Sequence, residues 1–230
     1  MDSILENIKI IHNRMNAVCS KINRNPEEVR LLMATKTVSP ERIRIAIEAG
    51  EKLVGENRVQ EFALKNDALA DLEYERHFIG HLQTNKIKDI VKYRVNCVQS
   101  LDRIDLAQKL DQRYQAEGRS IDVMVQVNTS FEESKFGLDP NNVFDFLKEL
   151  KQYDTLKVKG FMTIGLYDAD EEKVRPSYIR LREIRDRAIN EGLISPGSNE
   201  LSMGMSNDLE TAIEEGATIV RVGSAIFGSR

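Results

Sequence analysis

Cysteine is scarce in this sequence, which has only Cys19 and Cys97 among 230 residues. A disulfide framework needs several cysteines at regular spacings, and a structural zinc site needs closely spaced pairs. The sequence therefore predicts neither a disulfide scaffold nor a metal site. Cys97 lies in an apolar segment, where a cysteine is more often part of the core than a nucleophile.

Long apolar runs are also missing, and none approaches the roughly 20 residues that a membrane-spanning helix needs. The opening segment, "MDSILENIKI", carries acidic residues where a signal peptide has a basic flank. We therefore expect a cytoplasmic protein with no membrane partner.

A strong charge of one sign is lacking as well. Lysine and arginine number 33, aspartate and glutamate number 37, and the two signs are interspersed along the chain. Nucleic-acid binding depends on a basic surface, so this balance argues against nucleic acid as the main partner. No linker, repeat or low-complexity tract divides the chain, and residues 1–230 are predicted to form one domain with a sizeable core.

What the sequence does contain is a regular alternation of short apolar runs and longer charged, amphipathic stretches. It follows an N-terminal segment, residues 1–24, in which apolar residues from Ile4 to Ile22 recur at helical spacing and predict one long helix. The apolar runs predict strands over 29–35, 52–55, 76–80, 95–100, 121–128, 156–164, 199–204 and 218–225. Helices are predicted between them, over 40–49, 59–69, 84–93, 102–116, 140–153, 171–190 and 208–215.

Eight strands that alternate with helices predict an α/β fold with a parallel sheet, and eight such units close a (β/α)₈ barrel. The competing fold, an open doubly wound sheet, usually has a glycine-rich turn after its first strand. Here that turn reads "ATKTVSP" and has no glycine, which favours the TIM-type barrel. Little chain follows Phe227, so we expect the N-terminal helix to pack where the last helix of the barrel would otherwise lie.

Two segments of small residues stand at the ends of the last two predicted strands, where a barrel of this type builds its site. They read "SMGMSND" and "VGSAIFG", and they contain Ser206, Gly223 and Ser224. Hydroxyls and unpaired backbone N–H groups in such loops bind phosphate, so we interpret the two segments as one phosphate cup. The alternative for Ser206 alone is the N-cap of the helix that follows, a common role for serine.

Lys36 ends the apolar run "LLMATKT" and would lie beside that cup, because the first and last strands of a barrel pair. A lysine and a phosphate site together hold pyridoxal 5′-phosphate (PLP), whose aldehyde forms a Schiff base. Partial burial near the cationic Arg221 would favour the neutral amine that this reaction needs. The alternative for Lys36 is a side chain that extends into solvent at the rim. Lys135 is the rival amine, but it is expected across the barrel, next to two glutamates.

Ordered motifs along nearly the whole chain resemble those of the YggS/PROSC family of pyridoxal phosphate homeostasis proteins. The matching segments are "LLMATKTVSP", "GENRVQE", "HFIGHLQTNK", "ESKFGL", "GFMTIG", "LSMGMSNDLETAI" and "VRVGSAIFGSR". The resemblance implies a (β/α)₈ barrel like the N-terminal domain of bacterial alanine racemase, with Lys36 as the Schiff-base lysine. It further implies that Ser206, Gly223 and Ser224 hold the phosphate, that Arg221 faces the pyridine nitrogen, and that Asn57 lies beside the ring. Met203 is expected to pack against the ring or the core.

An arginine at the pyridine nitrogen limits the chemistry, because arginine donates hydrogen bonds but does not release its proton in proteins. The ring nitrogen then stays largely unprotonated, and the cofactor is a weaker electron sink. Two-base racemisation also needs an acid or base on each face of the cofactor. Alanine racemase takes its opposing tyrosine from a second domain, for which we expect no room after Arg230. His81 is the one histidine near the rim, and a loop hydrogen bond is its simpler role.

We therefore expect a protein that carries, buffers or delivers PLP, with PLP-dependent apo-enzymes as recipients, little or no catalysis and a monomeric state. Two alternatives stay open, namely a small amino-acid racemase and a barrel that binds another phosphate ester. The role of Glu56 also stays open, since it would orient Asn57 or Lys36, or bond a neighbouring backbone group.

Overall fold

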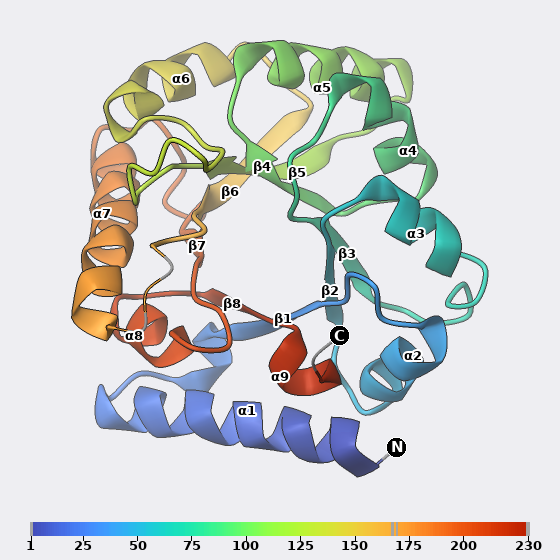
Figure 1. Cartoon of the computed structure of the whole chain (residues 1–230). Helices are drawn as coiled ribbons and strands as arrows, with labels where there is room; N and C mark the ends of the chain where they lie inside the picture. The colour runs from blue at the N-terminus through green and yellow to red at the C-terminus, as the bar shows by residue number, and fades with distance from the viewer. Residues whose placement is uncertain (1, 167, 169, 229–230) are drawn as a thin grey trace.

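The strands form a closed barrel in the computed structural model, which describes residues 2–166, 168 and 170–228. Each strand runs parallel to the next along the chain, and β8 pairs with β1 to close the ring (Figure 1). The strands are β1 Arg30–Ala34, β2 Leu53–Glu56, β3 Glu75–Phe78, β4 Cys97–Leu101, β5 Ile121–Gln126, β6 Leu156–Met162, β7 Glu200–Ser202 and β8 Ile219–Val222. The predicted (β/α)₈ barrel is confirmed. Residues 1, 167, 169 and 229–230 of the predicted domain lie outside the described residues.

The helices surround the barrel and bury their apolar faces against the strands (Figure 1). They are α1 Asp2–Lys21, α2 Pro40–Glu48, α3 Val59–Lys65, α4 Ile87–Lys92, α5 Ile104–Ala116, α6 Val143–Leu150, α7 Glu171–Asn190, α8 Leu209–Glu214 and α9 Ser224–Phe227. The predicted helices at 84–93 and 140–153 are shorter than expected. Each opens with one 3₁₀ turn, Thr84–Lys86 and Pro140–Asn142, before it continues as α4 and α6.

Helix α1 lies where the ring of helices begins and ends, across α8, α9 and α2 (Figure 1). Its buried face is the apolar stripe expected from the sequence, Ile4, Ile8, Ile11, Met15 and Val18. Asn7 adds a polar contact, since its Nδ2 donates to the carbonyl of Ile226 in α9 at 2.9 Å. Helix α1 therefore packs where the last helices of the ring meet the first.

The last strand is shorter than the predicted segment 218–225. It ends at Val222, and Ser224 and Ala225 already belong to α9. Gly223 makes the change of direction with φ −126° and ψ −76°. A Cβ atom at this residue would lie 2.8 Å from the carbonyl oxygen of Ala34, so only glycine lets the chain turn this close to the end of β1.

Side chains alternate along the strands between the barrel interior and the layer under the helices. The interior apolar cluster contains Leu32, Leu53, Cys97, Met124, Met162 and Ile219. Both cysteines are free and buried, which agrees with a core role for Cys97. In the part of the chain that the structure describes, no helix has the length and apolarity to cross a membrane.

Candidate functional site

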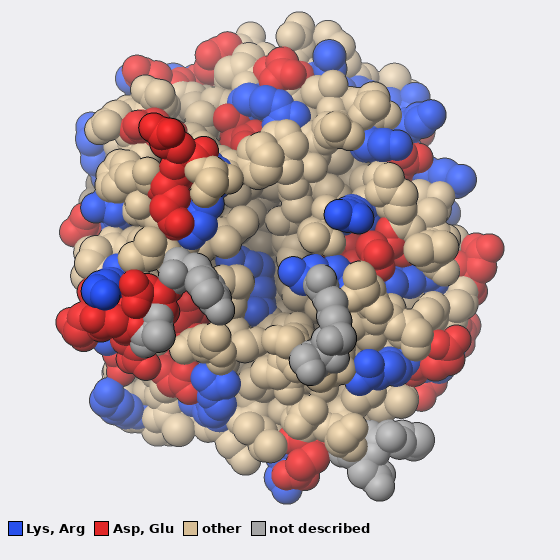
Figure 2. All heavy atoms as spheres, in the orientation of Figure 1, with Lys and Arg blue, Asp and Glu red and all other residues tan. Residues whose placement is uncertain are grey.

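Lys36 follows the last residue of β1 by two positions and lies in the turn from Thr35 to Val38. Its side chain is exposed, so the expected partial burial is wrong. The reason is geometric, because the strand ends at Ala34 and the turn carries Lys36 past the buried wall of the barrel. Figure 2 shows a hollow near the centre of the ring of helices, with lysine or arginine atoms at its wall.

The loops after β7 and β8 meet at the neighbouring strand ends. Gly204 has φ +91°, a conformation that favours glycine, and its carbonyl accepts the backbone N–H of Arg221 at 3.0 Å. Gly223 in turn packs against the backbone of Ala34, two residues before Lys36. The structure therefore brings the two small-residue loops together, and brings the second one against the end of β1.

Ser206 and Ser224 differ in their surroundings. Ser224 is exposed and begins α9, where the first N–H groups of a helix have no partner within it. Ser206 lies in the turn before α8 and is partly buried, but the N-cap residue of that helix is Asp208. The alternative role of Ser206 as an N-cap is therefore not what the structure shows.

Asn57 and Met203 differ in how deeply they are buried. Asn57 is half-buried directly after β2. Met203 is fully buried and belongs to the large apolar core under the helices, while the preceding Ser202 faces the barrel interior. Of the two environments expected for Met203, the structure shows the core.

Arg221 lies inside the barrel with 6% of its surface exposed. Its Nη1 donates to the hydroxyl of Ser202 at 2.9 Å, and its Nη2 donates to the carbonyl of Thr163 at 2.7 Å. Burial lowers the pKa of Arg221 from its ordinary value, but an arginine keeps its proton in proteins. The guanidinium is thus a fixed cationic donor at this end of the barrel.

A polar chain continues from Arg221 down through the barrel. The Ser202 hydroxyl donates to Gln99 Oε1 at 2.6 Å, and Gln99 Nε2 lies 2.7 Å from His77 Nδ1. Because the amide Nε2 of Gln99 can only donate, His77 Nδ1 is the acceptor in this arrangement. These residues were missed in the sequence, although polar residues within otherwise apolar strands are the signal that points to them.

His77 Nε2 lies 3.4 Å from Glu75 Oε2, and Arg30 Nη2 donates to the same carboxylate oxygen at 2.6 Å. The interaction with His77, together with Arg30 and against partial burial, lowers the pKa of Glu75 to about 2. The polar chain therefore ends in charges at the opposite, N-terminal end of the strands.

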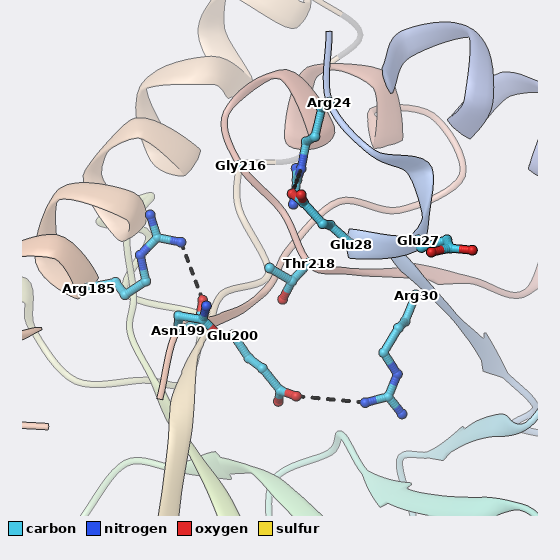
Figure 3. Close-up of a pocket in the computed structure, with 9 residues that line it drawn as sticks. All are labelled: Arg24, Glu27, Glu28, Arg30, Arg185, Asn199, Glu200, Gly216 and Thr218. Carbon is cyan, nitrogen blue, oxygen red and sulfur yellow. Dashed lines mark hydrogen bonds and ion pairs between the residues drawn. The ribbon is translucent and has the colours of Figure 1, made fainter. Parts of the chain in front are cut away.

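A cavity of about 490 Å³ lies at that N-terminal end. Figure 3 shows the side chains that line it. Its arginines are paired with acids or carbonyl groups. Arg24 pairs with Glu28, Arg30 with Glu200, and Arg185 donates to the carbonyl of Asn199 (Figure 3). Arg30 also pairs with Glu75. Barrels of this type place their chemistry at the C-terminal strand ends, so we assign this cavity no functional role.

Lys135 and His81 lie on the loops around the mouth and are both engaged. Lys135 forms an ion pair with Glu132 and donates to the carbonyl of Gly165. The ring of His81 stacks on that of Phe136, with centroids 3.9 Å apart and planes 18° apart. These contacts agree with structural roles for both residues.

The groups at the C-terminal end of the barrel suit a phosphorylated aromatic aldehyde as ligand. The ends of β1 and β8 bring an exposed lysine, two small-residue loops and a buried guanidinium to one end of the barrel. An amine suits the aldehyde, small-residue loops leave room for phosphate, and a donor-only cation suits an unprotonated ring nitrogen.

Known proteins support this reading. Residues 2–230 match the family model of the alanine racemase N-terminal domain. A curated relative from Aquifex aeolicus is named "Pyridoxal phosphate homeostasis protein" and is 43% identical over 225 residues, which are 98% of this chain and 97% of the relative.

Two solved structures are similar over nearly their whole length. An unknown protein from Bifidobacterium adolescentis is 38% identical, with a TM-score of 0.92 over 98% of this chain and 95% of that one. PipY from Synechococcus elongatus, solved with PLP bound, is 31% identical, with a TM-score of 0.82 over 94% of this chain and 100% of that one.

Proposed function

The chain belongs to the alanine racemase N-terminal domain family, and from that premise we propose that it binds PLP and acts in intracellular PLP homeostasis. One observation of the structure carries most weight. The loop after β8 packs on the end of β1 at Gly223, so the proposed phosphate site and the turn of Lys36 are neighbours. The relatives named for PLP homeostasis and the PLP-bound PipY support the same cofactor.

Lys36 is the proposed covalent anchor. Bound PLP would supply an aldehyde, and the Lys36 amine would hold it through a reversible C=N bond, with the aldehyde oxygen released as water. Ser206, Gly223 and Ser224 are the proposed phosphate ligands, Arg221 is the proposed partner of the pyridine nitrogen, and Asn57 is the proposed neighbour of the ring, while Met203 packs in the apolar core.

The homeostasis role is proposed to involve little or no catalysis. Arg221 is buried and held by Ser202 and Thr163, so it offers the ring nitrogen a fixed donor and no exchangeable acid. His81 is stacked on Phe136 at the rim, which favours a structural role over that of a second base. We infer that the protein holds PLP reversibly and releases it to PLP-dependent apo-enzymes.

The proposal also covers the domain organisation, the cellular location and the oligomeric state. We propose that residues 1–230 form one PLP-binding barrel domain, with residues 1–24 as its packing helix, and that it works in the cytoplasm as a monomer. The absence of a basic surface bias argues against nucleic acid as a partner.

Spectroscopy of the purified protein with added PLP tests the anchor. The wild type is expected to gain the visible absorbance band of a Schiff base. Lys36→Ala is expected to lose that band while the phosphate contacts retain some of the cofactor. Lys135→Ala, which removes the rival amine, is the control and should keep the band. A wild type that takes up no PLP would contradict the proposal.

Hydrogen exchange in heavy water tests the absence of catalysis. The PLP-loaded protein is incubated with L-alanine and other L-amino acids, and the Cα proton is followed by NMR. We expect no exchange at enzyme-like rates and no D-isomer. Rapid exchange with formation of the D-isomer would instead establish the racemase alternative.

A further inference from the structure

The turn that carries Lys36 is held from outside the barrel by a largely buried group of polar and charged side chains that we call the Lys65 cluster, consisting of Thr35, Glu56, Glu61 and Lys65. Lys65 is 5% exposed, Glu56 is 1% exposed and Thr35 is fully buried. Glu56 ends β2 and the other two charged residues come from α3. Buried charges are rare unless they are paired, so the cluster needs an explanation.

The ammonium of Lys65 uses all three of its donors within this cluster. Its Nζ donates to the carbonyl of Thr35 at 2.8 Å and to Glu56 Oε1 at 2.6 Å, and lies 2.7 Å from Glu61 Oε2. The Thr35 hydroxyl donates to Glu56 Oε1 at 2.6 Å as well. Residue 35 is therefore fixed through both its backbone and its side chain.

Residue 37 is fixed by the same cluster. The Glu61 Oε2 atom that contacts Lys65 also accepts the backbone N–H of Thr37 at 3.1 Å. Thr37 has φ +63°, which is unfavourable for a β-branched residue and persists only where the surroundings hold it. Both neighbours of Lys36 are thus clamped, while the Lys36 side chain itself is exposed.

The pKa values of Glu56 and Glu61 shift in opposite directions. Burial raises the pKa of Glu56, against the charge of Lys65 and the hydrogen bonds from Lys65 and Thr35. Burial also acts to raise the pKa of Glu61, but the hydrogen bonds from Lys65 and Thr37 lower it overall. Glu56 Oε2 is buried without a hydrogen-bond partner among the described residues. A buried oxygen without a partner lowers the free energy of unfolding.

We propose that Lys65, acting through Glu56 and Glu61, is a positioning residue that holds the strained turn 35–37 and so presents the Lys36 amine to the cofactor aldehyde. This inference rests on the proposed function. It assigns a role to Glu56, since Glu56 ties Lys65 to Thr35, beside Lys36. The Lys65 cluster orients the amine and does not touch the cofactor, so its loss should slow bond formation without weakening the phosphate contacts.

Two probes separate positioning from binding. PLP reports formation of the covalent bond through the rate of appearance of the visible band. Pyridoxine 5′-phosphate carries the same ring and phosphate with an alcohol in place of the aldehyde, so its affinity reports the noncovalent contacts alone. The variants are Glu61→Ala, Glu61→Gln and Lys65→Met, and Glu149→Ala on the exposed face of α6 is the control.

Glu61→Ala is expected to slow bond formation roughly 10- to 100-fold, the size of effect that small misplacements of a reacting group produce. Its affinity for pyridoxine 5′-phosphate should stay within about twofold of wild type. Glu61→Gln keeps an oxygen that accepts the Thr37 N–H and should recover most of the rate, and Glu149→Ala should match wild type. Lys65→Met leaves Glu56 buried without its cation, so Glu61→Ala carries the test if that variant does not fold.

Wild-type rates in Glu61→Ala would overturn the inference and leave the proposed function intact. An equal loss of pyridoxine 5′-phosphate affinity would also overturn it, because the Lys65 cluster would then maintain the whole site. A wild-type protein that forms no covalent bond at Lys36 would instead overturn the proposed function, and the inference with it.

Discussion

Gln99 is the residue that keeps the polar chain inside the barrel continuous. It accepts from the Ser202 hydroxyl and donates to His77, and it is fully buried. A leucine there would leave the Ser202 O–H and His77 Nδ1 buried without their partner, at about 1–3 kcal/mol each. We expect Gln99→Leu to lower the free energy of unfolding by about 2–6 kcal/mol. Urea denaturation measures this, with the exposed Gln108→Leu in α5 as the control that should change little.

Glu75 makes stability depend on pH in the acid range. Its pKa is about 2 in the folded protein, below its ordinary value of 4.5, because of His77 and Arg30. As the pH falls below 4.5 the unfolded chain takes up this proton first, so folding loses the contribution between pH 4.5 and about 2. Glu75→Gln should therefore show a smaller loss of stability between pH 5 and pH 3 than wild type. Equal losses in urea titrations at the two pH values would refute this.

At the residue scale the sequence predicted lysine, arginine and small residues at the mouth and left the role of Glu56 open, but it missed Lys65 and the polar chain below Arg221. Lys65 is one of the three buried residues of α3, with Val59 and Phe62, at helical spacing. A lysine within an apolar helix face was the available signal. Its partners Glu56 and Thr35 lie at the end of β2 and directly after β1, and the pairing of these strands in the barrel brings them together.

At the scale of elements, α1 contributes to stability because it closes the ring of helices. Ile11 is 1% exposed and packs in the core, whereas its neighbour Ile10 is 48% exposed. Ile11→Ala should lower the free energy of unfolding by about 2–5 kcal/mol through lost burial and a cavity, and Ile10→Ala should cost far less. Thermal and urea denaturation of the two variants measure the difference. Equal effects would mean that α1 does not pack as described.

The bounds of elements with a strong local sequence pattern were predicted closely. The bounds of elements that depend on long-range contacts were not. Helix α7 has the predicted bounds, 171–190, because a long amphipathic repeat and the N-cap Asp170 define it locally. The start of α9 was read as strand, because Gly223 turns where it meets Ala34, nearly two hundred residues earlier in the chain. The 3₁₀ turns before α4 and α6 likewise have no distinct apolar repeat.

At the scale of the whole molecule, the closed barrel joins its first and last strands and so joins the two parts of the proposed site. Lys36 and Gly223 are far apart in the sequence, and the pairing of Met33 with Val222 brings their strand ends together. The alternating pattern of strands and helices predicts a closed barrel, and closure alone pairs β1 with β8. The exposure of Lys36 could not be predicted in this way, because it depends on the turn after Ala34.

The proposed monomeric state is a property of the whole molecule. Helix α1 covers the place of a last barrel helix, so that side of the barrel is closed by the chain's own residues. Light scattering coupled to size-exclusion chromatography, with and without PLP, should give the mass of one chain. A stable dimer at micromolar concentration would contradict the proposal.

The central claim is that Lys36 holds PLP covalently, and chemical trapping tests it most directly. Wild-type protein loaded with PLP is reduced with borohydride, which fixes the Schiff base, and is then digested and mapped by mass spectrometry. We expect one modified residue, Lys36, in the segment that follows β1. A label on Lys135 or another lysine, or no stable label on a protein that binds PLP, would contradict it.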